Sequence, residues 1–134
     1  SIAPALGLPG TGIATDHALT TRVLSSIDGT ALLSTPYLNF PAEYARALLR
    51  SDGGAPVPVV TASPRAHGFA GARGAAGLVS AAHALCAAAH ARGGGPILEW
   101  ERGQWSYHAK GLWIAAADGE HPSCTLAGSS NFGA

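Results

Sequence analysis

Residues 57–100, VPVVTASPRAHGFAGARGAAGLVSAAHALCAAAHARGGGPILEW, form the stretch that decides the fold. It starts with a short apolar run at residues 57–61, which predicts a strand. An alanine-rich segment then predicts a helix over residues 75–91, and the glycines at 93–95 end it. A second strand is expected at residues 97–100. An order of strand, helix and strand is typical of a layered α/β domain.

The residues on either side of this stretch continue the same alternation. Asp16 can cap a helix over residues 17–27, and Pro41 suits the first turn of a helix that reaches residue 50. Further strands are expected at residues 30–35, 106–109, 112–116 and 123–127, with Asp118-Gly119 as the hairpin turn between the last two. Residues 1–14 are rich in Gly and Pro and are expected to be a loop or linker. We therefore expect one α/β domain over residues 15–134, with a mixed sheet flanked by helices.

The composition excludes several classes of protein. Of the 134 residues, eight are Lys or Arg and eight are Asp or Glu, so no basic field predicts nucleic-acid binding. No apolar run approaches the ~18 residues of a membrane span, so any membrane contact is expected to be peripheral. Cys86 and Cys124 lack metal-ligand spacing and are expected to be buried thiols in a reducing compartment. The tryptophans are expected to pack in the core or on the sheet; they are Trp100, Trp105 and Trp113.

Two segments carry the residue types of phosphoryl chemistry. They are YHAKGLWI at residues 107–114 and GSSNFG at residues 128–133. On the strand predicted at 106–109, residues two apart share a face, so His108 and Lys110 would project side by side. The lysine would neutralise phosphoryl oxygens and the histidine would act as nucleophile or proton donor. The turn after the next predicted hairpin could bring Ser129 and Asn131 to the same oxygens.

A His-x-Lys pair alone is more typical of a solvated strand edge than of a catalytic site. Two observations favour the catalytic interpretation. Lys110 is the only lysine in the chain, whose other seven cations are arginines. The Gly128-Ser129-x-Asn131 turn also follows the predicted hairpin that returns the chain towards His108.

The two segments resemble the phospholipase D superfamily, whose signature is His-x-Lys, an aspartate further on, and then Gly-Ser-x-Asn. Beyond this signature, longer stretches of the sequence are similar to those of the eukaryotic mitochondrial phosphatidylglycerophosphate synthases. The similarity lies in HAKGLW at residues 108–113, in CTLAGSSNFG at 124–133, and in the Ala, Ser, Pro, His, Gly and Phe positions of residues 62–82. Together these blocks extend the resemblance over about residues 30–133.

The resemblance implies a layered phospholipase-D-like fold and a phosphatidyltransferase. Such an enzyme transfers a phosphatidyl group from CDP-diacylglycerol to glycerol-3-phosphate through a phosphohistidine, giving phosphatidylglycerophosphate and CMP. By the resemblance His108, Lys110 and Asn131 are catalytic, and Gly128 and Ser129 bind substrate; whether His108 is the nucleophile or the acid/base stays open. No metal or other cofactor is implied, because lysines and imidazoles supply the charge stabilisation. An inner mitochondrial membrane location, with peripheral contact, rests on the resemblance alone.

The sequence departs from the superfamily pattern in two ways. Ala115 stands where the aspartate usually falls, and Asp118 comes three residues later in the predicted turn. Superfamily enzymes also pair two motifs across one cleft, whereas this chain has one. The domain is therefore expected to be the second-motif half, incomplete at both ends, with the partner motif on a missing N-terminal half or on a second copy. Such a half is expected to be inactive alone.

The Gly-rich loop at residues 67–74 is a further candidate for binding phosphate. It precedes a predicted helix whose N-terminal amides could hold the anion, and Arg73 is its candidate side chain. A simple connector is the alternative. His83 and His90, seven residues apart on the predicted helix, are expected to be packing or surface residues rather than ligands.

Two other functions remain open from the sequence. One is a phospholipase-D-type phosphodiesterase or lipase that uses water as acceptor; the neutral net charge disfavours a nuclease. The other is a half-domain without catalysis, which serves folding or dimerisation.

Overall fold

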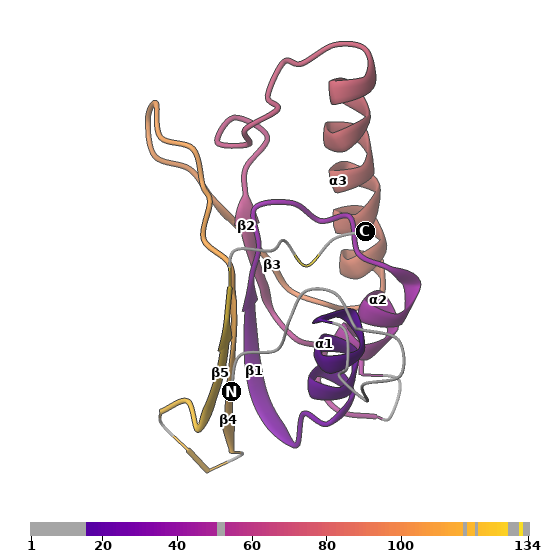
Figure 1. The fold of residues 1–134 in the computed structure, drawn as a ribbon, viewed down its shortest axis with the longest axis vertical. Coiled ribbons are helices and arrows are strands. Elements are labelled where there is room, and N and C mark those ends of the chain that lie inside the picture. Colours follow the sequence, from indigo (N-terminus) through magenta and orange to yellow (C-terminus); the bar gives the residue numbers. More distant parts are fainter. Residues whose placement is uncertain (1–15, 51–52, 117, 120, 129–131, 133–134) are drawn as a thin grey trace, which may run out of the picture.

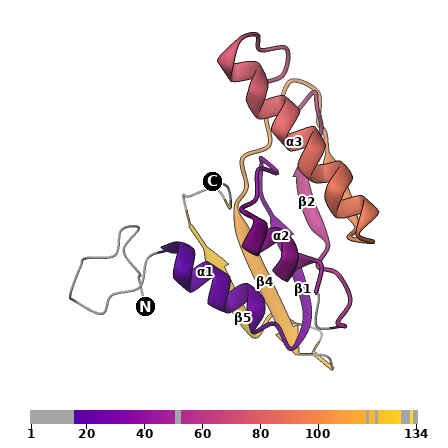
Figure 2. The ribbon, with the colours of Figure 1, turned by 90° about the vertical axis from the view of Figure 1, so that its right-hand side faces the viewer.

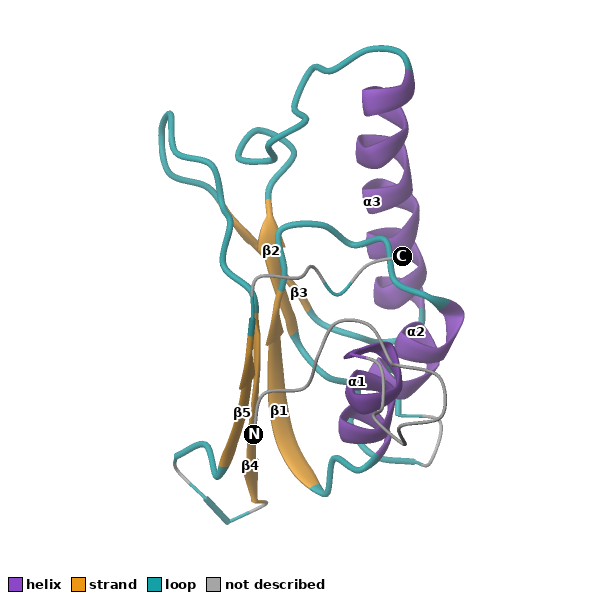
Figure 3. Ribbon diagram, viewed as in Figure 1, coloured by secondary structure: helices purple, strands orange, loops and turns teal. Residues whose placement is uncertain are grey.

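The computed structural model describes residues 16–50, 53–116, 118–119, 121–128 and 132. The predicted linker at residues 1–14 lies outside them. Figures 1 and 3 show the elements along the chain. In order they are α1 (Asp16–Ser25), β1 (Gly29–Ser34), α2 (Ala42–Leu48), β2 (Val59–Ala62), α3 (Ala75–Arg92), β3 (Ile97–Trp100), β4 (Gly111–Ala116) and β5 (Cys124–Ala127).

The strands form one mixed sheet in the order β3-β2-β1-β4-β5. β1 pairs in parallel with β2, and β2 with β3, because α2 and α3 return the chain between them. β4 then runs antiparallel to β1, and β5 antiparallel to β4. All three helices lie on one side of this sheet, as Figures 1 and 2 both show. The predicted mixed sheet and α/β class are confirmed.

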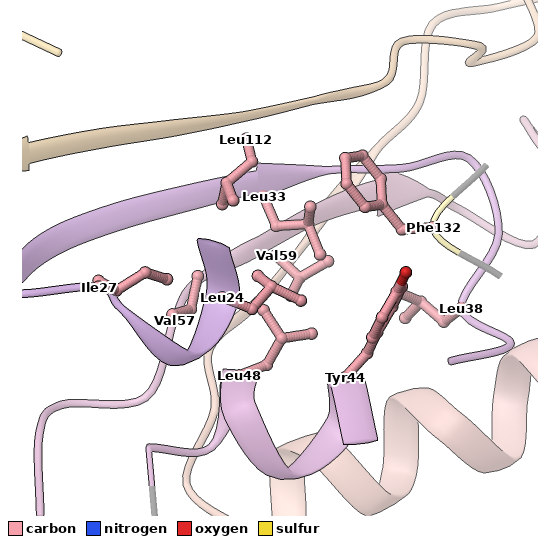
Figure 4. Packing of buried hydrophobic residues seen from close by; sticks show 10 residues of the cluster. All are labelled: Leu24, Ile27, Leu33, Leu38, Tyr44, Leu48, Val57, Val59, Leu112 and Phe132. Carbon is pink, nitrogen blue, oxygen red and sulfur yellow. The ribbon is translucent and has the colours of Figure 1, made fainter. Parts of the chain in front are cut away.

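The core lies between the sheet and the two short helices. Leu24 of α1 and Leu48 of α2 point towards Leu33 of β1 (Figure 4), and all three are at most 1% exposed. Burying one such side chain contributes about 1.5–3 kcal/mol. The full cluster is Leu24, Ile27, Leu33, Leu38, Tyr44, Leu48, Val57, Val59, Leu112 and Phe132. This core joins both helices to the sheet and fixes the position of the strand ends.

The end of α3 follows from the three glycines. Gly94 has a φ of +83°, and its N–H donates to the Ala91 carbonyl at 3.0 Å. The N–H of Gly95 donates to the His90 carbonyl, also at 3.0 Å. This pair of bonds is the Schellman ending, which needs a left-handed residue that glycine adopts without strain. The helix end predicted from the sequence is confirmed.

The prediction of a strand at residues 106–109 is wrong. Residues 103–110 are loop apart from the short turn at Arg102 and Trp105, and the ladder with β1 begins only at Gly111, opposite Ser34. Just before it, the Tyr107 N–H donates to the Ala66 carbonyl of the loop after β2, at 3.0 Å. The segment therefore satisfies its backbone against a loop instead of a neighbouring strand.

Three smaller expectations also change. Cys124 is exposed on β5 and Cys86 is only half-buried on α3, so the two are not both buried thiols. Trp105 is 67% exposed, so it is not a packing residue. Asp16, the predicted cap, lies within α1. Among the described helices, none combines the length and apolar character needed to cross a bilayer.

Candidate active site

The candidate site lies at one edge of the sheet, where β1, β2, β3 and β5 end and β4 begins. Gly111, the first residue of β4, pairs with Ser34 at the end of β1 and with Ala127 at the end of β5. Lys110 immediately precedes Gly111, and Gly128 immediately follows Ala127. The fold therefore brings the His108 segment and the start of the Gly128 turn to the same edge, as the sequence predicts.

His108 and Lys110 lie on the loop that enters β4, not on a strand. His108 is exposed and Lys110 is half-buried. The Lys110 ammonium donates a hydrogen bond to the backbone carbonyl of His108 at 3.2 Å. The two residues are thus linked directly, although by this bond and not by sharing a strand face. An ammonium carries three donors, so it has further N–H groups to offer a phosphoryl oxygen.

Tyr107 anchors this loop to three separate parts of the fold. Its hydroxyl lies 2.6 Å from the Ser34 hydroxyl oxygen at the end of β1, and its N–H is bonded to Ala66. Its ring packs against Trp100 of β3, with 5.4 Å between ring centroids. The residue next to His108 is therefore fixed, which limits where the imidazole can lie.

A second network ties β3 to the loop after β2 at the same edge. Ser63 donates to Glu101 Oε2 at 2.7 Å, and Arg65 pairs with Glu101 Oε1 at 3.3 Å. The Ser63 hydrogen bond, with the Arg65 charge, lowers the pKa of Glu101 below its usual value. Sequence reasoning left Glu101 unassigned and missed Ser34, Ser63 and Tyr107 as a group. Their shared signal is a position at or just beyond a strand end.

Asp118 lies at the opposite edge of the sheet from His108. It follows the far end of β4, and the five steps from Gly111 to Ala116 extend about 17 Å at the usual strand rise. The turn predicted at Asp118-Gly119 does join β4 and β5, with a Gly119 N–H to Ala116 carbonyl bond of 2.9 Å. Asp118 therefore cannot take the place of the superfamily aspartate beside His108.

The other predicted site residues divide into two groups. Ser129 and Asn131 lie outside the described residues. Gly128 is exposed at the site edge, and Phe132, beyond the turn, is buried in the core. Arg73 is exposed in the loop before α3, and no described hydrogen bond or ion pair links it to His108 or Lys110.

Two buried histidines lie side by side, His67 at the start of the Gly-rich loop and His83 on α3. The rings of His67 and His83 meet edge to face at 5.0 Å, and Tyr37 packs against His67 at 4.7 Å. Phe69 and Leu38 donate backbone N–H bonds to Nδ1 of His67 and His83 respectively. Burial lowers the pKa of both imidazoles, that of His83 to about 4, so both are neutral near pH 7.

His83 and His90 are packing residues, in agreement with the sequence. His90 Nε2 lies 3.1 Å from the Val57 carbonyl oxygen, to which it donates, and burial lowers its pKa. Within the described part of the chain, no three His, Cys, Asp or Glu residues gather closely enough to hold a metal ion. A surface pocket of about 370 Å³ lies between α1 and α2, lined by residues such as Thr21 and Glu43, and does not include the sheet edge.

Comparison with known proteins identifies several relatives of this sequence. No protein-family model matches the chain. A probable CDP-diacylglycerol–glycerol-3-phosphate 3-phosphatidyltransferase of Dictyostelium discoideum is 32% identical, over 98% of this chain and 24% of the relative. The mitochondrial protein of that name from Gallus gallus is also 32% identical, over 98% of this chain and 25% of its own length. The human protein is 33% identical over 88% of this chain and 23% of its length.

A solved structure shares the fold. The crystal structure of phosphatidylserine synthase from Haemophilus influenzae aligns with a TM-score of 0.59 and 21% identity, over 81% of this chain and 27% of that one. This likeness confirms the predicted layered α/β fold, a mixed sheet flanked by helices. The chain spans about a quarter of the length of the curated relatives it matches. The chain is therefore homologous to a segment, about a quarter of the whole in length, of the eukaryotic CDP-diacylglycerol–glycerol-3-phosphate 3-phosphatidyltransferases.

Proposed function

We propose that this chain carries one half of a phosphatidyltransferase site. The enzyme transfers the phosphatidyl group of CDP-diacylglycerol to glycerol-3-phosphate and releases CMP. The observation that carries the proposal is the pairing of Gly111 with both Ser34 and Ala127, which places His108, Lys110 and Gly128 at one edge. The curated relatives that share this sequence are named for the same reaction.

The proposed reaction consists of two displacements at phosphorus. An imidazole nitrogen attacks the phosphorus that bears diacylglycerol, the P–O bond to CMP breaks, and CMP leaves with the bonding electrons. A hydroxyl of glycerol-3-phosphate then attacks the same phosphorus, the P–N bond breaks, and the hydroxyl proton passes to a second imidazole. His108 is one of these two imidazoles, either the nucleophile or the acid/base.

The remaining site residues bind the phosphoryl groups in this proposal. Lys110 and Asn131 bind phosphoryl oxygens, and Ser129 with the Gly128 backbone supports them. Arg73 is proposed to bind a phosphate of a substrate at the same end of the molecule. These groups provide the positive charge and hydrogen bonds that stabilise a phosphoryl transition state without a metal ion.

The second imidazole belongs to a second motif. It comes from an N-terminal half of a longer polypeptide or from a second copy of this chain, and the isolated chain is inactive unless it pairs with itself. By analogy with the relatives named as mitochondrial, the protein works in mitochondria, in peripheral contact with the inner membrane.

The first test measures CMP release by the complete polypeptide that the gene encodes. His108→Ala is expected to lower the rate at least about a thousandfold, because the imidazole forms or protonates the reacting bond. His121→Ala is the matched control, since His121 is exposed in the β4–β5 connection, away from the site edge. EDTA is expected to leave the rate unchanged. Unaltered CMP release in His108→Ala would contradict the catalytic proposal.

The same assay separates the transferase from the alternatives. CMP release that requires glycerol-3-phosphate identifies a transferase. Release with water alone, giving phosphatidate, would identify a phospholipase-D-type hydrolase instead. No release by a correctly assembled polypeptide would leave the structural half-domain as the remaining interpretation.

A further inference from the structure

The loop between β3 and β4 projects from the sheet as a narrow tip. Residues 101–107 rise beyond the strand ends at the end of the molecule that also carries the Gly-rich loop and the start of α3 (Figures 1 and 2). The tip is closed by a tight turn, in which the Trp105 N–H donates to the Arg102 carbonyl at 2.9 Å. Gly103 takes a φ of +51° at the first central position, as hairpin turns of this kind require.

The turn presents an exposed aromatic residue with a cation above it. Trp105 is 67% exposed, whereas Trp100 and Trp113 are half-buried against the sheet. The Arg102 guanidinium lies over the Trp105 ring, 5.6 Å from its centroid. An indole with a polar edge beside an arginine is the pair that favours the headgroup layer of a bilayer, where one side is apolar and the other wet.

The charge around this end of the molecule has the sign that an anionic surface attracts. Apart from Arg65, which is paired with Glu101, this region carries three cations: Arg73, Arg102 and Lys110. The remaining described carboxylate here is Glu99 on β3. Asp28 and Asp118 lie at the opposite edge, before β1 and after β4. The described charges at the site end therefore sum to a net positive value, which is the sign that a surface of anionic phospholipid attracts.

We propose that the 101–107 tip is a membrane anchor that inserts Trp105 into the headgroup layer of an anionic phospholipid bilayer. The proposal rests on the proposed function, since it explains how His108 meets a phosphate that is fixed at a membrane surface. Tyr107 is bonded to Ser34 and Ala66, so the tip and His108 are held in one orientation. When Trp105 contacts the bilayer, His108, three residues further along the chain, lies at the depth of the lipid phosphate groups.

Vesicle binding by the 134-residue chain tests the anchor without any need for catalysis. The probe is a sedimentable vesicle of equal parts phosphatidylcholine and phosphatidylglycerol, with pure phosphatidylcholine as the neutral comparison. Trp105→Ala is expected to weaken partitioning to the anionic vesicles about tenfold, because a large aromatic surface no longer leaves water. Arg102→Gln is expected to weaken it about fivefold, and only on the anionic vesicles.

Leu85→Ala is the matched control, because Leu85 is 71% exposed on α3 and lies outside the tip. Circular dichroism checks that all variants keep the fold of the parent chain. Vesicle binding that survives Trp105→Ala, that falls equally in Leu85→Ala, or that is absent from the parent chain would overturn the proposal. Those results would indicate a protein partner at Trp105 or another lipid-binding face.

The outcome is independent of the proposed chemistry. Tip-dependent vesicle binding without CMP release by the complete polypeptide would reject the transferase and keep the anchor. CMP release that Trp105→Ala lowers on vesicles but leaves unchanged on detergent-dispersed CDP-diacylglycerol would support both. Equal rates for parent and variant on both forms of the substrate would reject the anchor alone.

Discussion

At the scale of single residues, Tyr107 holds the candidate nucleophile or acid/base in place. Its hydroxyl and that of Ser34, which is 3% exposed, satisfy each other in a partly buried position. Tyr107→Phe leaves the Ser34 hydroxyl without this partner, at a cost of about 1–3 kcal/mol in unfolding free energy. In the complete polypeptide we expect kcat to fall more than KM rises, because the change alters the position of His108 and leaves the substrate contacts in place.

A double-mutant cycle with Ser34→Ala measures this bond by chemical denaturation. The double variant is expected to be more stable than the sum of the two single changes predicts, because no hydroxyl is then left unpaired. Strictly additive effects would show that the bond contributes nothing.

His83 makes the stability of the chain depend on pH. In the folded state burial lowers the pKa of His83 to about 4, whereas the unfolded side chain titrates near 6.5. Above about pH 6.5 both states are neutral and the full stability is present; as the pH falls from there towards 4, only the unfolded state binds the proton. The unfolding free energy is therefore expected to fall by about 3 kcal/mol over this range from His83 alone.

His83→Asn tests that dependence. The asparagine oxygen can accept the Leu38 N–H that Nδ1 accepts now, at 3.2 Å, but it does not titrate in this range. Denaturant titrations from pH 7 to pH 4 should show a flatter curve for the variant. His121→Asn, at an exposed histidine, should keep the parent slope. Parallel curves for the parent and His83→Asn would show that another group is responsible.

Candidate residues can be identified from the sequence where they form a local motif, and they are missed where they depend on distant contacts. The His108 and Lys110 pair and the Gly128 turn are visible as short motifs. The bond from Tyr107 to Ser34 joins residues 73 positions apart, and that from Ser63 to Glu101 joins residues 38 apart. No local pattern encodes such pairs, because they form only after the strands have aligned.

At the scale of elements, Gly94 provides the left-handed residue that ends α3. Gly94 has a positive φ, and a Cβ placed there meets nothing within 4 Å, so the penalty of a side chain is conformational and not steric against a neighbour. Gly94→Ala is expected to lower the unfolding free energy by about 1–2 kcal/mol. Gly94→Asn is expected to cost less, since asparagine tolerates the left-handed region. Thermal or denaturant unfolding measures both; equal stability of parent and alanine variant would contradict this account.

The elements themselves were largely predictable, with one exception. The helix expected at residues 75–91 is α3, and the strand at 97–100 is β3. The glycines that end α3 and the apolar residues that mark β3 are local signals. The segment at 106–109 also alternates polar and apolar residues, yet alternation indicates a strand only where a partner strand is available. β1 is six residues long and already fully paired with Gly111–Ala116, so the ladder has no position for residues 106–109.

At the scale of the whole molecule, the sequence predicted the α/β class but not the order of the strands. The placement of β1 between β2 and β4 decides which loops meet, and it follows from burial in three dimensions. Leu33 of β1, wholly buried, is paired with Val59 of β2 on one side and Leu112 of β4 on the other. This central strand is the reason that a motif near residue 108 and a loop near residue 63 share one edge.

The anchoring of Tyr107 on one side and Gly111 on the other has a consequence for how this chain can vary in length. Residues 108–110 connect two residues that the rest of the fold holds in place, Tyr107 and Gly111. Adding or deleting one residue in this segment would therefore break the contacts of Tyr107 or the pairing of Gly111. The turn at Gly103 and Gln104 is closed only by the Arg102–Trp105 bond and is not held between two parts of the sheet, so a change of length there leaves the strands and His108 in place but moves Trp105 relative to Arg102. Insertions and deletions in natural or engineered variants are therefore expected at the turn. The number of residues from Tyr107 to Gly111 is expected to stay constant.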